Sequence, residues 1–121
     1  MVTIMTNRFR LTIAQLNPTV GDFAGNTQKA YDAWQAGKNA GADMVALPEM
    51  FITGYQAQDI VMKPAFTAGA MQTVDDLALR CSDGPALGIG SSFAQDGKLY
   101  NAYHILQGGR VTGRMLKHRL P

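Results

Sequence analysis

The sequence predicts an α/β fold with the element order β-α-β-α-β-β-β. In the first two thirds of the chain, short runs of strand-forming residues alternate with two segments of helical periodicity. In the last third, three strand-like runs follow one another, separated by Asp96-Gly97 and Gly108-Gly109. Because such dipeptides favour tight hairpins, we expect two crossover connections followed by an antiparallel meander.

The boundaries of the first four elements follow from periodicity and from Pro and Gly signals. A strand is expected over residues 9–16, and a helix from residue 26 or 27 to about residue 39. A buried strand is expected over residues 44–47, and Pro64 suits the first turn of a second helix. The stripes expected to face the core are Ala30, Ala33, Trp34, Gly37 and Ala40 on the first helix, and Ala70, Val74, Leu77, Ala78 and Cys81 on the second.

The three remaining strands are expected over residues 86–93, 99–106 and 110–117. No internal repeat, low-complexity tract or linker interrupts the pattern. A length of 121 residues is that of one ordinary domain.

The composition excludes several classes of function. A net charge of +2 is too small to indicate nucleic-acid binding, and we interpret the basic residues after residue 109 as a solvated strand face. The single cysteine excludes an internal disulfide and fits a reducing compartment. No apolar run approaches the ~18–20 residues needed to span a membrane, and the N-terminus has no signal-peptide pattern. We therefore expect a cytoplasmic protein that binds neither nucleic acid nor membranes.

Glu49 follows the second predicted strand directly, after Leu47-Pro48. In open α/β sheets, ligands and catalytic groups collect outside the carboxyl ends of the strands. Apolar neighbours such as Met50 and Phe51 would raise the pKa of a carboxyl group toward the range useful for a general base. The alternative interpretation is that Glu49 is a solvated carboxylate at the end of the strand, without a catalytic role.

Two further side chains are candidates for chemistry. Lys117, at the end of the last strand, is either a donor to a developing oxyanion or a surface lysine in a basic stretch. Cys81 is the only thiol, but it lies near the C-terminus of the second helix, whose partial negative charge disfavours a thiolate. We expect Cys81 to be a buried core residue and not a nucleophile. The two histidines, His104 and His118, lack the spacing of metal ligands.

These motifs together resemble the nitrilase or carbon–nitrogen hydrolase superfamily. The segments that carry the resemblance are Gly21-Asp22-Phe23-Ala24-Gly25-Asn26, Leu47-Pro48-Glu49 and Lys117-His118-Arg119-Leu120-Pro121. The resemblance implies an α-β-β-α sandwich of two sheets. Residues 1–121 would form an incomplete N-terminal part of that domain, with residues 1–7 as a flexible start.

Two longer segments, residues 15–22 and 54–59, resemble a narrower branch: the N-terminal glutaminase domains of glutamine-dependent NAD synthetases. This resemblance implies hydrolysis of glutamine, with Glu49 as general base, Lys117 at the oxyanion and Tyr55 beside the glutamine pocket. The released ammonia would convert deamido-NAD to NAD in a C-terminal synthetase domain that uses ATP and magnesium. The present segment is expected to bind no cofactor or metal.

The family's nucleophilic cysteine lies on a strand beyond the lysine, and Cys81 does not match that position. We therefore expect a truncated segment that is inactive alone and whose uncovered sheet faces favour a homo-oligomer. Two alternatives stay open. One is part of a stand-alone amidase or carbamoylase of the nitrilase family. The other, from a different class, is a non-catalytic α/β binding or assembly module.

Overall fold

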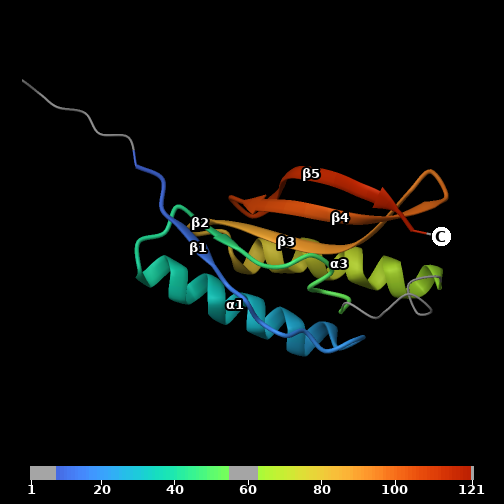
Figure 1. Cartoon of the computed structure of the whole chain (residues 1–121), viewed down its shortest axis with the longest axis horizontal. Coiled ribbons are helices and arrows are strands. Elements are labelled where there is room, and N and C mark those ends of the chain that lie inside the picture. Colours follow the sequence, from blue (N-terminus) through green and yellow to red (C-terminus); the bar gives the residue numbers. More distant parts are fainter. Residues whose placement is uncertain (1–7, 55–62, 121) are drawn as a thin grey trace, which may run out of the picture.

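The computed structural model describes residues 8–54 and 63–120, except the side chain of residue 118. In chain order the elements are β1 (Leu11–Ile13), α1 (Phe23–Asn39), β2 (Met44–Ala46), α3 (Pro64–Arg80), β3 (Ala86–Gln95), β4 (Lys98–Gln107) and β5 (Arg110–Arg119) (Figure 1). The order is the predicted one, so the α/β fold class is confirmed. The predictions for residues 1–7 and for Tyr55 fall outside the described residues.

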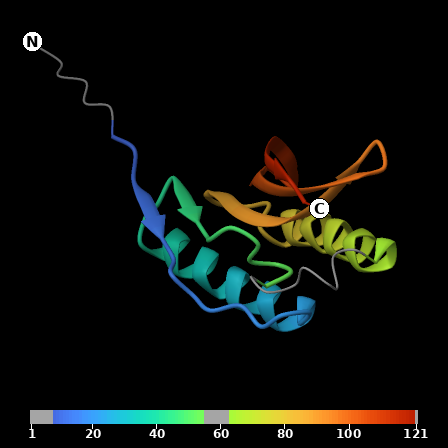
Figure 2. The ribbon, with the colours of Figure 1, turned by 45° about the vertical axis from the view of Figure 1, so that its right-hand side comes forward.

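The five strands form one mixed sheet in the order β1-β2-β3-β4-β5. β1, β2 and β3 pair in parallel, whereas β3, β4 and β5 pair antiparallel, as two crossovers and a meander require. Both helices lie on the same side of the sheet, with α1 under β2 and α3 under β3 and β5 (Figures 1 and 2). Within the described residues, no helix covers the opposite side.

The first helix begins at Phe23, three residues before the expected start, because Asp22 is its N-cap. The Asp22 carboxylate accepts a hydrogen bond of 2.9 Å from the backbone N–H of Gly25, which satisfies one of the free donors of the first turn. Asn26 therefore lies inside the helix and is buried. Its side chain binds the backbone of Thr19 and donates to the carbonyl of Ile52, over 2.9 Å. It ties the loop after β1 to the loop that carries Glu49.

The core fills the space between the two helices and the sheet. The stripe predicted for α3 is buried throughout, and on α1 the buried members are Ala30, Trp34 and Gly37. Ala40 is exposed, contrary to expectation, because α1 ends at Asn39 and residue 40 is its C-cap. A Cβ atom at Gly37 would lie 2.3 Å from Cγ2 of Val45, so glycine lets α1 approach β2 closely.

The opposite face of the sheet carries a different set of side chains. On β1, Thr12 faces α1, so Leu11 and Ile13 point away from it and are 49% and 67% exposed. On β4, Ala102 and Leu106 are buried, and the alternate positions Asn101 and Tyr103 point to the other face. The candidate site lies on this second face.

His104 is buried on β4, next to the core. Its Nδ1 accepts a hydrogen bond of 3.1 Å from Nε of Arg114, whose guanidinium stacks over the ring of Phe93 at 4.1 Å. Burial, assisted by the charge of Arg114, lowers the pKa of His104 to about 4. The predicted solvated basic face is therefore only partly solvated, since Arg114 is fixed over an aromatic ring and a buried histidine.

We expect the protein to lose stability as the pH falls from 7 to 5. In this window the unfolded state protonates His104 near its ordinary pKa of ~6.5, whereas the folded state keeps it neutral down to about pH 4. The unfolded state thus binds more protons, and the free energy of unfolding decreases by about 2 kcal/mol at pH 5. Urea unfolding at the two pH values measures the difference. His104→Gln should remove this component, and an unchanged pH dependence in that variant would contradict the assignment.

Candidate active site

The segment that carries Glu49 leaves β2 but stays attached to β3. The backbone N–H of Leu47 donates to the carbonyl of Gly88 over 2.8 Å, and the N–H of Gly90 donates to the carbonyl of Pro48 over 3.1 Å. The chain then turns at Met50, which has a positive φ of 50°, and Ile52 bonds back to the carbonyl of Gly90. Glu49 therefore lies in a tight turn whose backbone is held on both sides by hydrogen bonds to one strand.

Gly90 is the position on β3 at which this turn touches the sheet. A Cβ atom at Gly90 would lie 2.4 Å from the backbone nitrogen of Met50 and 2.5 Å from Cα of Glu49. Both contacts are with backbone atoms, which cannot move aside as a side chain can. Glycine at position 90 thus sets how closely Glu49 approaches the sheet.

Lys117 reaches Glu49 from a β-bulge in β5. Asn101 pairs with His118 and Ala102 pairs with Leu116, so Lys117 is the extra residue between them. A bulge of this kind re-aims a side chain relative to the regular alternation of the strand. The Lys117 ammonium forms an ion pair with Oε1 of Glu49. The structure therefore brings the two candidate side chains, Glu49 and Lys117, into contact.

Two residues of β4, Asn101 and Tyr103, complete the surroundings of Glu49. The side-chain amide of Asn101 donates to Oε2 of Glu49 over 3.2 Å. The hydroxyl of Tyr103 donates to the carbonyl of Leu47 over 2.8 Å, and burial raises the pKa of Tyr103 above its ordinary value. Sequence reasoning assigned neither residue a role. The available signal was a buried-strand sequence with polar residues at the alternate positions 101 and 103, which pair with Ser92 and Gly90 of β3.

The environment of the Glu49 carboxylate differs from the apolar pocket that the sequence predicted. Its neighbours Met50, Phe51 and Ile52 are buried, but the Glu49 side chain is 42% exposed and is bound by a cation and an amide. The apolar side chains turn into the interior while the carboxylate stays at the surface. The resulting group is an oriented carboxylate beside an ammonium, which can exchange a proton and stabilise a developing negative charge.

Cys81 does not belong to this site. Its side chain is 1% exposed and packs in the core at the C-terminal end of α3. Burial raises the pKa of the Cys81 thiol to about 12, with Arg80 opposing the shift weakly. A thiol with this pKa stays protonated and is not a nucleophile at neutral pH. The expectation of a buried structural cysteine is confirmed.

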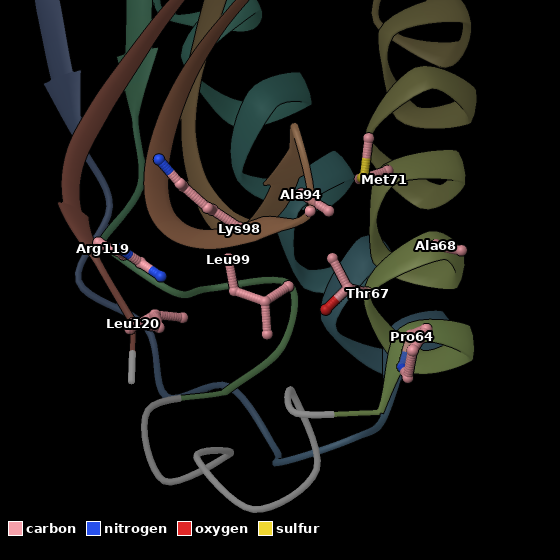
Figure 3. Close-up of a pocket in the computed structure, with 10 residues that line it drawn as sticks. Pro64, Thr67, Ala68, Met71, Ala94, Lys98, Leu99, Arg119 and Leu120 are labelled. Carbon is pink, nitrogen blue, oxygen red and sulfur yellow. The ribbon is translucent and has the colours of Figure 1, made fainter.

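A cavity of about 470 Å³ lies near the site without containing it. It is lined by residues from the start of α3, the β3–β4 hairpin and the end of β5 (Figure 3). Lys98 and Arg119 contribute positive charge to its wall, and Leu99 and Leu120 contribute apolar surface. Neither Glu49 nor Lys117 lines it.

Over residues 8–54 and 63–120, no three His, Cys, Asp or Glu side chains are grouped so that they could hold a metal ion. In the same part of the chain, no helix is long and apolar enough to cross a membrane.

The fold and the site together define a class: an α/β domain with an acid and a lysine brought together beside the strand ends. The sequence pattern of the carbon–nitrogen hydrolase family matches residues 10–121. The chain belongs to the carbon–nitrogen hydrolase family, which confirms the predicted superfamily.

Individual relatives narrow the similarity. The chain is 60% identical over 117 residues to a glutamine-dependent NAD(+) synthetase of Rhodobacter capsulatus, covering 97% of this chain and 21% of that relative. It is 32% identical over 114 residues to the glutamine-dependent NAD(+) synthetase of Thermotoga maritima, covering 94% of this chain and 20% of the relative. The narrower resemblance is confirmed, and the chain spans about a fifth of the length of these relatives.

Solved structures agree with this similarity. A glutamine-dependent NAD(+) synthetase from Cytophaga hutchinsonii superposes with a TM-score of 0.85 at 28% identity, covering 91% of this chain and 19% of that one. An amidase from Nesterenkonia sp. superposes with a TM-score of 0.77 at 18% identity, covering 97% of this chain and 45% of that one. The second likeness shows a shared fold alone.

Proposed function

We propose that this chain supplies the general base and the oxyanion-binding cation of the glutaminase domain of a glutamine-dependent NAD synthetase. The observation that carries the proposal is the ion pair between Glu49 and Lys117. The two side chains are far apart in the sequence, and the sheet brings them together on one face. The 60% identity to a glutamine-dependent NAD(+) synthetase supports the choice of reaction over that of a stand-alone amidase.

In the proposed reaction, the Glu49 carboxylate takes the proton from the thiol of the family's nucleophilic cysteine, which lies beyond Lys117. The thiolate sulfur forms a bond to the side-chain amide carbon of glutamine, and the carbonyl electron pair moves onto oxygen. Lys117 stabilises this oxyanion. The oxyanion re-forms the carbonyl, the carbon–nitrogen bond breaks, and the protonated Glu49 gives its proton to the nitrogen, which leaves as ammonia. Glu49 then deprotonates a water molecule, which attacks the thioester carbon. The carbon–sulfur bond breaks to release glutamate, and Glu49 returns its proton to the thiolate.

The remainder of the proposal concerns the whole protein. The ammonia would convert deamido-NAD to NAD in a synthetase domain that uses ATP and magnesium. Among the described residues, no three His, Cys, Asp or Glu side chains are grouped to hold a metal ion, so we assign the magnesium to the synthetase domain. A cytoplasmic location and a homo-oligomeric state belong to the same proposal, and light scattering of the purified protein tests the latter.

Lys117→Met in the full-length protein tests the proposal. Removing one donor to an oxyanion lowers the rate of such reactions by roughly 10²–10³-fold, and we expect a loss of that size in glutamine hydrolysis. NAD synthesis from added ammonia should stay unchanged, because it bypasses the site. Lys29→Met is the matched control, since Lys29 is exposed on α1 and, in the described part of the chain, its ammonium donates to the carbonyl of Asn17. Full glutamine hydrolysis by Lys117→Met would refute the proposed role and favour a non-catalytic module.

A further inference from the structure

We infer that Asn101 is a positioning residue that holds the Glu49 carboxylate in its working orientation. This inference rests on the proposed function, because it concerns the same site. It adds a residue of β4 that acts on the reaction through Glu49.

The two oxygens of the Glu49 carboxylate are held by different strands. Oε1 pairs with Lys117 of β5, and Oε2 accepts from the amide of Asn101 on β4 over 3.2 Å. Two contacts on opposite oxygens restrict rotation of the carboxylate about its terminal bond. A carboxylate has about four acceptor positions, so these two contacts leave positions free to take up a proton.

The two contacts differ in rigidity. The Lys117 side chain is 37% exposed and long, whereas Asn101 is 4% exposed. Asn101 also lies on a central strand that pairs with Ser92 of β3 and with His118 of β5. A lysine that must turn toward an oxyanion during the reaction cannot at the same time fix the base. Asn101 can, because it is anchored on both sides and its short side chain has few conformations.

The orientation of the Asn101 amide follows from the chemistry of its partner. A carboxylate only accepts hydrogen bonds, so the NH₂ group must face Glu49. The amide oxygen then lies buried, and within the described residues no partner satisfies it. A buried unsatisfied oxygen is unfavourable for folding, which makes stability a poor reason for an asparagine here. The bond to Glu49 provides a functional reason.

Asn101 is neutral at every pH at which the protein folds, so it does not compete with Glu49 for a proton. Among the described residues, the charged group in contact with Glu49 is Lys117 from β5. The nearby titratable group on β4 is Tyr103. Its hydroxyl donates to the carbonyl of Leu47 and stays protonated. A hydrogen bond to the carboxylate favours its charged form. Losing that bond should raise the pKa of Glu49. The acid limb, which is the pH range in which glutamine hydrolysis falls as Glu49 becomes protonated, should then move to higher pH.

The test compares Asn101→Leu, Asn101→Asp and Ser92→Ala in the full-length protein. For Asn101→Leu we expect roughly 10–100-fold lower kcat for glutamine hydrolysis, a nearly unchanged KM, and an acid limb moved to higher pH. Asn101→Asp keeps the side-chain size and should move the acid limb further, because a second carboxylate faces Glu49. Ser92→Ala is the matched control. Ser92 is buried directly opposite Asn101 on β3 and has an unpartnered hydroxyl in the described part of the chain, so its loss should leave rate and profile unchanged.

A wild-type acid limb in both Asn101 variants would overturn the inference, whether or not their rates fall, because a purely structural role lowers activity without moving the limb. The isosteric aspartate keeps the test decisive if the leucine variant does not fold. Failure of the proposed function is a separate result: a Lys117→Met protein that hydrolyses glutamine normally would refute that function directly.

Discussion

Glu49→Gln in the full-length protein is expected to abolish NAD synthesis from glutamine while NAD synthesis from ammonia continues. Glutamine has the size of glutamate but cannot accept the proton of the nucleophile or return it to the leaving group. General acid–base catalysis of this kind contributes roughly 10²–10⁴-fold to a rate, and here one group serves both steps. We therefore expect a loss at the upper end of that range, measured as NAD formed with each nitrogen donor.

The control for this variant is Asp75→Asn, which makes the same chemical change at an exposed position of α3. It should leave both activities intact. An equal loss of glutamine-dependent and ammonia-dependent synthesis in Glu49→Gln would show a general defect of folding or assembly. That outcome would remove the assigned role of Glu49.

Gly90→Ala is expected to produce the second large effect, through the backbone of the site. The added methyl group would lie 2.4–2.5 Å from backbone atoms of Met50 and Glu49, so the turn must move away from β3. Overpacking of this kind costs about 1–3 kcal/mol of stability. A displacement of about 1 Å at a catalytic group costs on the order of 10²-fold in rate. Thermal unfolding and glutamine hydrolysis of the variant measure the two effects.

Gly113→Ala provides a matched control in the same sheet. A Cβ atom at Gly113 on β5 would meet only the side chain of Ile105, at 3.5 Å, which is an ordinary contact. Its stability and its glutamine hydrolysis should stay close to those of the unchanged protein. If Gly90→Ala behaves like Gly113→Ala, the close approach of Glu49 to β3 is not required for the reaction.

The strand predictions failed only in length, and for a physical reason. The first strand was expected over residues 9–16, but β1 is Leu11–Ile13 because it pairs with β2 alone, at three positions. β2 is equally short, since the chain turns away after Leu47 at Pro48. Strand-forming residues indicate that a strand is present, whereas its length depends on the partner strand.

In the candidate site, too, the sequence identified some features and the tertiary structure supplied the others. Glu49 and Lys117 were candidates from their places after and within strands, and from the family resemblance. Asn101 was not a candidate, because the role of a polar residue on a strand depends on which side chains lie near it in the folded sheet. The bulge that brings Lys117 into contact with Glu49 arises from the pairing of β4 with β5, and the periodicity of β5 does not reveal it.

The sequence by itself determined the element order, the family and the two charged residues of the candidate site, because periodicity, turn residues and local motifs are encoded over short stretches. Only the tertiary structure decided that these two residues form an ion pair and that Asn101 donates to the same carboxylate. Each of these facts depends on contacts between strands or helices distant in the chain. Such contacts are set by register, bulges and close backbone approach, which no local pattern specifies.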